Sequence, residues 1–143
     1  MTYETHSDQE TFDLAKNLAK DFKGGDVIGL IGDLGAGKTV FSKGLAAGLG
    51  VTEMVTSPTF VVMKVYECHN NPSIKLMCHI DAYRLNNEVE LVNMGISDYL
   101  KEPDAITVIE WADKISTLLP KETTNISIIH SEHGRKITVQ SNG

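Results

Sequence analysis

Hydrophobic and polar residues are spaced along the first third of the chain in a way that predicts a helix, a buried strand and a second helix. Ser7-Asp8-Gln9-Glu10 has the form of a capping box, and apolar residues follow it at helical spacing as far as Gly24-Gly25. The run from Asp26 to Ile31 is short, apolar and bounded by glycines, which is typical of a buried parallel strand. After a glycine-rich turn, residues 38–49 have apolar positions at helical spacing, and Gly50 suits a left-handed C-terminal cap.

The rest of the chain predicts strands and helices in uneven alternation. Residues 60–68 and 74–81 have the pattern of two strands on either side of a turn-forming Asn-Asn-Pro-Ser segment, which predicts an antiparallel hairpin. The further elements expected are a helix over 88–100 interrupted at Gly95, a strand over 105–111, a short helix over 112–119, and strands over 125–129 and 136–140. This order predicts one α/β domain over residues 1–143, with helices packed on a mixed sheet.

The composition excludes several classes of protein. With 41% hydrophobic and 22% charged residues the chain has the composition of an ordinary globular domain, which excludes disorder. Its formal net charge of −6 disfavours direct binding to nucleic acid. Neither Cys68 and Cys78 nor the scattered histidines have the spacing of a disulfide framework or a zinc site. Because no apolar run reaches the length of a signal peptide or a membrane span, we expect a cytoplasmic protein without membrane association.

The segment Gly32–Thr39 carries the strongest chemical signal. Its sequence, GDLGAGKT, matches G-x-x-x-x-G-K-[ST] in full, directly after a predicted strand and at the start of a predicted helix. In such a loop the backbone N–H groups surround a β-phosphate, Lys38 reaches the β- and γ-phosphates, and Thr39 offers its hydroxyl to Mg²⁺. The residues expected to bind the nucleotide are Asp33, Leu34, Gly35, Ala36, Gly37, Lys38 and Thr39. Together with the mixed sheet, this loop predicts a three-layer α/β sandwich of the P-loop NTPase kind.

ATP and Mg²⁺ are the cofactors that this loop predicts. The guanine-reading tetrapeptide N-K-x-D does not occur in the chain, which favours ATP over GTP. A P-loop also needs an acidic residue at the end of a neighbouring strand to complete the metal shell. Asp81 and Glu110 each end an apolar run, and the pattern leaves open which of them contacts the metal.

Four motifs, taken together in their order and spacing, resemble the bacterial TsaE (YjeE) family. They are Gly32–Thr39, Ser57–Phe60, the segment HIDAYRL at 79–85, and Glu110-Trp111, and the resemblance spans nearly the whole chain. That family comprises small P-loop ATPases that act in making threonylcarbamoyladenosine in tRNA, together with the TsaD–TsaB heterodimer. The resemblance therefore implies TsaD–TsaB as partner, and the acidic charge of this chain predicts that tRNA is contacted only indirectly, through that partner.

Carried over residue by residue, the resemblance implies roles around the phosphates. Thr39 and Glu110 would hold Mg²⁺, while Asp81 would act at the γ-phosphate side as a catalytic residue together with Lys38. Ser57–Phe60 would form a switch-like loop, in which Pro58 favours an extended backbone.

The resemblance also implies contacts with the rest of the nucleotide. Trp111 matches a tryptophan beside the metal-binding glutamate, although a position in the core explains the indole as well. Thr5, Ser7 and Thr11 fall where the family's N-terminal segment approaches the base, although helix capping explains Ser7 equally. Arg135 either reaches the nucleotide or only occupies a turn.

Two other functions remain open beside that of an ATPase: a small-molecule kinase and a nucleotide-gated binding module. A kinase usually clamps the transferred phosphoryl group with several arginines, and this chain has only Arg84 and Arg135. The same shortage predicts slow ATP hydrolysis by the chain alone and stimulation by a partner.

Overall fold

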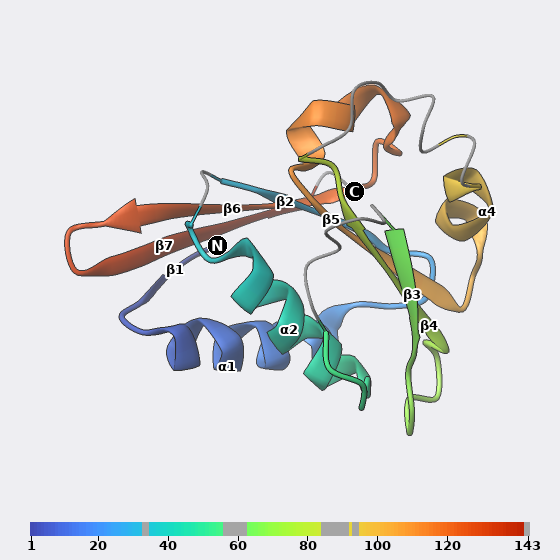
Figure 1. Ribbon diagram of the computed structural model, residues 1–143, viewed down its shortest axis with the longest axis horizontal. Helices are drawn as coiled ribbons and strands as arrows, with labels where there is room; N and C mark the ends of the chain where they lie inside the picture. Colours follow the sequence, from blue (N-terminus) through green and yellow to red (C-terminus); the bar gives the residue numbers. More distant parts are fainter. Residues whose placement is uncertain (33–34, 56–62, 84–91, 93–94, 142–143) are drawn as a thin grey trace.

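The computed structural model describes residues 1–32, 35–55, 63–83, 92 and 95–141, and within them seven strands form one sheet (Figure 1). The strands are β1 (Thr2–Thr5), β2 (Val27–Ile31), β3 (Met63–Glu67), β4 (Leu76–Asp81), β5 (Ala105–Glu110), β6 (Thr124–Ser131) and β7 (Gly134–Ser141). The helices are α1 (Asp8–Leu18), α2 (Lys38–Leu49) and α4 (Ile96–Lys101), with 3₁₀ segments η1 (Ala19–Asp21) and η2 (Ala112–Leu118).

The sheet is mixed, and its order is β1-β7-β6-β2-β5-β4-β3. The four inner strands β6, β2, β5 and β4 run parallel, whereas β3 at one edge and β7 and β1 at the other are antiparallel to their neighbours. Strand β2 lies in the middle and is almost entirely buried, as its apolar sequence VIGLI requires. The segment that follows β2 therefore leaves from the centre of the sheet, between the ends of β5 and β6.

Helices cover both faces of the sheet, which makes three layers (Figure 1). On one face α1 and α2 pack over Ile28, Leu30 and the alternate residues of the neighbouring strands. On the other face α4 and η2 pack over Val27 and Ile109. Consecutive residues of one strand enter opposite cores because side chains alternate along a strand. The predicted three-layer α/β sandwich with a mixed sheet is confirmed.

Most of the predicted elements are confirmed near their expected bounds. The Ser7 hydroxyl caps α1 by accepting from the Glu10 N–H at 3.1 Å, and the Glu10 carboxylate accepts from the backbone N–H of His6 rather than that of Ser7. Helix α2 ends at Gly50, whose φ of 95° is left-handed as predicted. The antiparallel β3–β4 hairpin is also present.

Four elements differ from the prediction or lie partly outside the described residues. Of the strand expected over 60–68, the structure describes β3 from Met63, and residues 60–62 lie outside the described residues. Strand β1 was not expected, because its sequence is polar and only Thr5 in it is buried. The short helix after β5 is a 3₁₀ segment with a kink at Ile115. Of the helix expected over 88–100, the structure describes α4 after Gly95, and residues 88–91, 93 and 94 lie outside the described residues.

Both cysteines are free thiols that burial keeps protonated. Desolvation raises the pKa of Cys78, within β4, to about 12 and that of Cys68, just after β3, to about 11. Because the thiolate is the nucleophilic form, neither residue supplies a nucleophile near neutral pH. Within the described residues, no helix is both long and apolar enough to span a membrane.

Candidate functional site

The carboxyl ends of three parallel strands bring the candidate residues to one edge of the sheet. Strand β2 leads into the glycine-rich segment, β5 ends at Glu110, and β4 ends at Asp81. Glu110 pairs in register with Asp81 on one side and with Leu30 on the other. Because paired positions of neighbouring strands belong to the same face, both carboxylates lie on the face that α2 covers. An open crevice at the carboxyl ends of parallel strands is where α/β proteins bind their ligands.

The glycines of the loop are required by its backbone and its neighbours. Gly35 and Gly37 have φ values of 79° and 107°, a region that other residues rarely adopt. A Cβ on Gly32 would lie 2.2 Å from the carbonyl oxygen of Ile128, and one on Gly37 would lie 2.9 Å from the Arg135 guanidinium carbon. Side chains are thus excluded where the loop must present its N–H groups to an anion. Asp33 and Leu34 lie outside the described residues.

Lys38, the first residue of α2, directs its ammonium group across the loop. Its Nζ donates to the carbonyl oxygen of Gly32 at 2.5 Å and lies 4.0 Å from the centroid of the Trp111 ring. Only 5% of Lys38 is exposed, so its charge lies between the Gly32 carbonyl group and the Trp111 indole rather than in water. A phosphate entering the loop would take over contacts that Gly32 and Trp111 now make.

Trp111 belongs both to the site and to the core. Its indole packs partly against the cluster around Ile109 and Ile115, while one face meets the Lys38 ammonium. Its ring centroid lies 4.9 Å from that of Tyr83, and the Trp111 φ of 61° is unusual for a bulky residue. Such backbone strain persists where the surrounding structure imposes it, as it does between β5 and η2.

Glu110 is the centre of a buried polar cluster that joins α2 to the sheet. The Thr39 hydroxyl donates to Glu110 Oε1 at 3.0 Å, the Ser42 hydroxyl donates to Oε2 at 3.4 Å, and His79 Nε2 lies 2.6 Å from Oε2. The carboxylate and the imidazole are both buried. Since Thr39 gives its proton to Glu110, the lone pairs of its hydroxyl oxygen stay available for a cation.

Thr39 and Glu110 fit Mg²⁺ better than a metal ion whose ligands all come from the protein. The Thr39 hydroxyl and the Glu110 carboxylate are oxygen ligands, which Mg²⁺ prefers. In the described part of the chain no three His, Cys, Asp or Glu side chains gather as a metal cluster. Mg²⁺ commonly binds through one or two protein oxygens, with phosphates and water completing its octahedron.

Asp81 is held in a fixed orientation beside this cluster. Its Oδ1 accepts from the backbone N–H of Tyr83 at 2.9 Å, an Asx turn that directs the carboxylate at the end of β4. The Lys114 ammonium in turn donates to the Tyr83 carbonyl at 2.6 Å. Asp81 is partly exposed, unlike Glu110, so it has access to water as well as to the strand ends.

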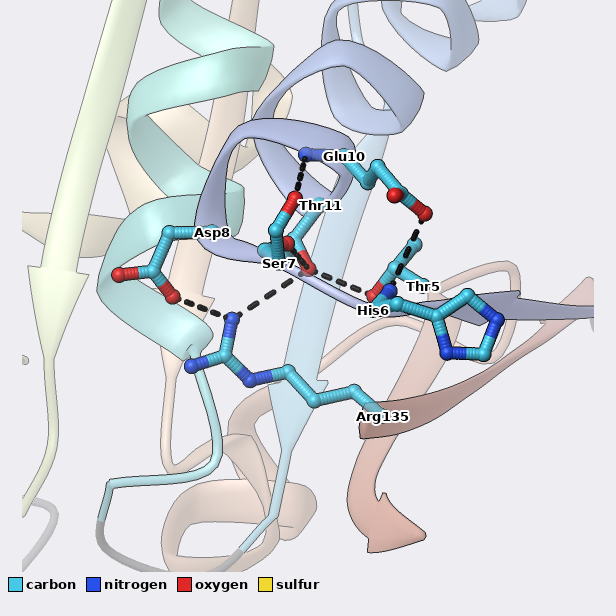
Figure 2. Close-up of polar contacts among 7 residues, drawn as sticks. All are labelled: Thr5, His6, Ser7, Asp8, Glu10, Thr11 and Arg135. Carbon is cyan, nitrogen blue, oxygen red and sulfur yellow. Dashed lines mark hydrogen bonds and ion pairs between the residues drawn. The ribbon is translucent and has the colours of Figure 1, made fainter. Parts of the chain in front are cut away.

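A second polar cluster lies beside the loop at the start of α1 (Figure 2). Arg135 Nη1, from β7, lies 2.7 Å from Asp8 Oδ1 and donates to the Thr11 hydroxyl at 3.4 Å. The Thr11 and Thr5 hydroxyls are 2.7 Å apart and buried. An open pocket of about 190 Å³ adjoins this cluster and is lined by Thr5, His6, Ser7, Asp8, His130, Gly134 and Arg135. The Arg135 guanidinium lies next to Gly37, close enough that a Cβ there would clash with it, and so connects this pocket to the loop.

Comparison with known proteins identifies the family. The family model described as "Threonylcarbamoyl adenosine biosynthesis protein TsaE" matches residues 5–137. The chain belongs to the TsaE family. The resemblance stated from its motifs is therefore confirmed.

Curated relatives and a solved structure agree with the TsaE assignment. The chain is 39% identical to the tRNA threonylcarbamoyladenosine biosynthesis protein TsaE of Bacillus subtilis, over 100% of this chain and 87% of that protein. It is 35% identical to the TsaE of Treponema pallidum, over 94% of this chain and 96% of that protein. The crystal structure of Bacillus subtilis YdiB aligns with a TM-score of 0.80 and 35% identity, over 100% of this chain and 86% of that chain.

The structure of this TsaE member brings together most of the residues singled out from the sequence. Those gathered at the strand ends are Gly35, Ala36, Gly37, Lys38, Thr39, Asp81, Glu110 and Trp111, with Ser7 and Arg135 beside them. Thr5 and Thr11 are 4% and 0% exposed and their hydroxyls lie 2.7 Å apart. Thr11 also accepts from Arg135, and Thr5 lines the pocket beside that guanidinium. Ser57–Phe60 and Arg84 lie outside the described residues.

Three residues of these clusters were given no role in the site from the sequence: His79, Ser42 and Asp8. His79 stands two positions before Asp81 on the same strand, a period-two signal that places both on one face. Ser42 lies one turn after Thr39 on α2 and so shares its helix face. Asp8 is an ordinary acidic residue for the first turn of a helix, so the sequence gives no sign that it pairs with Arg135.

Proposed function

We propose that this TsaE member is a Mg²⁺-dependent ATPase that acts with TsaD–TsaB in the threonylcarbamoyladenosine modification of tRNA in the cytoplasm. The observation that supports this most is the hydrogen bond between Thr39 and Glu110, at 3.0 Å. It joins the hydroxyl of the P-loop to an acidic strand end, the pair of residue types that holds Mg²⁺ in P-loop NTPases. The names of the curated relatives supply the tRNA modification.

In this proposal each residue has a part in the hydrolysis of ATP. The loop N–H groups and the start of α2 bind the phosphates, and the Lys38 ammonium exchanges the Gly32 carbonyl for phosphate oxygens. Mg²⁺, when bound at Thr39 and Glu110, would neutralise charge on the β- and γ-phosphates. Asp81 accepts a hydrogen bond and then the proton from a water whose oxygen attacks the γ-phosphorus. The bond between that phosphorus and the β–γ bridging oxygen breaks, and the products are ADP and phosphate.

The cluster around Arg135 is proposed to border the nucleotide on the side away from Glu110. Arg135 lies next to Gly37 of the loop and is oriented by Asp8, whose Oδ1 is 2.7 Å from its Nη1. The pocket lined by Ser7 and His6 opens beside this guanidinium. A half-buried guanidinium can stack on a planar ring or donate to an anionic oxygen, which suits either the base or the ribose phosphate.

A reconstituted reaction tests the function. We expect TsaD–TsaB, given ATP, Mg²⁺, unmodified tRNA and a source of the activated threonylcarbamoyl group, to make more threonylcarbamoyladenosine when this chain is added than without it. The nucleoside is measured by mass spectrometry after digestion of the tRNA. A kinase would instead transfer phosphate to a small acceptor, and equal nucleoside yield with and without the chain would refute the proposal.

The two strand-end acids should give different defects. Glu110→Gln weakens the metal site, so the gain in ATP affinity on adding Mg²⁺ should fall by about 10- to 100-fold. Asp81→Asn should leave affinity within about threefold and lower turnover by at least about 10²-fold, because Asp81 acts on the water. Calorimetry with Mg²⁺ or with EDTA measures the first effect, and phosphate release in the presence of the partners measures the second.

Glu67→Gln serves as the matched control, because Glu67 is an exposed acid at the end of β3. It should change neither quantity. If Asp81→Asn abolished the Mg²⁺ effect while Glu110→Gln spared it, the two roles would have to be exchanged.

A further inference from the structure

We propose that His79 is a positioning residue that holds Glu110 in the orientation needed to bind Mg²⁺. The inference rests on the proposed function of Glu110 as a metal-binding residue. His79 itself would touch neither the metal nor the nucleotide. Its role is to fix which oxygen of the Glu110 carboxylate faces the loop.

The contact between the two residues is short and buried. His79 Nε2 lies 2.6 Å from Glu110 Oε2, and their side chains are 0% and 3% exposed. His79 pairs in register with Val108, so its ring reaches forward along the sheet to Glu110, two residues further on. A hydrogen bond to a carboxylate in such a site is stronger than one exposed to water.

The cluster divides the two carboxylate oxygens between different partners. Oε2 is bound by His79 at 2.6 Å and by Ser42 at 3.4 Å, both of which belong to the packed interior. Oε1 receives the Thr39 hydroxyl at 3.0 Å and so lies toward the loop. Without His79, Oε2 would keep only the longer contact with Ser42, and the carboxylate could turn about its last side-chain bond, which has broad torsional preferences.

The other ring nitrogen shows that packing alone does not explain His79. Its Nδ1 is buried and has no hydrogen-bond partner among the described residues. A leucine of similar volume would fill the space without an unsatisfied polar atom. The polar ring is therefore useful at this position through its Nε2–H donor to Glu110.

Three variants separate positioning from packing. His79→Leu removes the donor, and outer-shell partners of this kind typically contribute about 10- to 100-fold to metal affinity. We expect the gain in ATP affinity on adding Mg²⁺ to fall by that factor, while affinity in EDTA stays within about threefold. His79→Gln restores an N–H donor of similar reach and should recover most of the Mg²⁺ effect. The control is Met77→Leu, a buried change on the same face of β4 that should leave both affinities unaltered.

The measurements are calorimetric titrations of the full chain with ATP, in Mg²⁺ and in EDTA, together with thermal unfolding of each variant. A His79→Leu protein that is folded and keeps the full Mg²⁺ effect would overturn the inference. So would a His79→Gln protein as defective as His79→Leu. If the unaltered chain shows no Mg²⁺-dependent ATP binding, it is the proposed function that fails.

A spectroscopic measurement keeps the inference testable even if His79→Leu does not fold. Long-range ¹⁵N–¹H correlation of the histidine rings in the nucleotide-free chain reports which nitrogen carries the proton. We expect Nε2 of His79 to be protonated, with its signal assigned by its loss in His79→Gln. A proton found only on Nδ1 would overturn the inference, because Nε2 could not then donate to Glu110.

Discussion

Purified alone, the chain should hydrolyse ATP slowly, and adding TsaD–TsaB should raise its turnover by about 10³- to 10⁵-fold. The reason is that, among the described residues at the candidate site, few positive charges are available for the transition state. Lys38 is used by the loop itself, and Arg135 is paired with Asp8 at 2.7 Å. P-loop enzymes that lack a cationic finger gain about this factor when a partner supplies one.

The measurement is steady-state phosphate release by the chain alone, with TsaD–TsaB, and with tRNA added. Asp81→Asn in the full mixture is the control, since it should remove the stimulated rate and show that this site produces the phosphate. Rapid turnover by the lone chain, unchanged by the partners, would instead identify an autonomous enzyme.

Replacing Lys38 by alanine should weaken ATP binding by about 10- to 150-fold, which corresponds to about 1.5–3 kcal/mol for a charge-assisted contact. In the structure the ammonium donates to Gly32 at 2.5 Å and lies over Trp111. Binding a phosphate replaces these contacts with a stronger ion pair. The variant loses the difference in free energy between the ion pair and the contacts that it replaces.

Calorimetry of ATP binding in Mg²⁺ measures this loss. Lys43→Ala is the matched control, because Lys43 is exposed on the same helix and should leave affinity unchanged. If Lys38→Ala bound ATP as tightly as the unaltered chain, the loop would not be the phosphate site.

The elements that the sequence predicted well are those defined by local patterns. The cap at Ser7, the buried strand β2 and the glycine end of α2 each depend on residues close together in the chain. Strand β1 was missed because its polar sequence carries no such pattern, and it exists by pairing with β7 at the far end of the chain. Long-range pairing of this kind leaves little trace in a single sequence.

The residues of the candidate site are likewise of two kinds, those that a local pattern indicates and those that only the fold brings together. Lys38 and Thr39 are set by the loop motif, and Glu110 and Asp81 by their places at strand ends, so the sequence alone indicated all four. The roles of His79 and Asp8 depend on side chains brought together across the sheet, from β5 and from β7. Nothing in the spacing of these residues identifies their partners.

The position of β2 in the sheet has a consequence for synthesis on the ribosome. Its two neighbours are β5, where Val27 pairs with Thr107, and β6, where Ile28 pairs with Thr124. Neither edge of this apolar strand can therefore pair until the last third of the chain has been synthesised. Until then a nascent chain carries a hydrophobic strand with unpaired N–H and C=O groups, which is a template for aggregation. The glycine-rich loop is translated early, yet the cluster beside it is complete only when Arg135 has left the exit tunnel and β7 has paired with β6. Ribosome stalling or truncation before that point would therefore yield a chain that is prone to aggregate and in which the candidate site is not assembled.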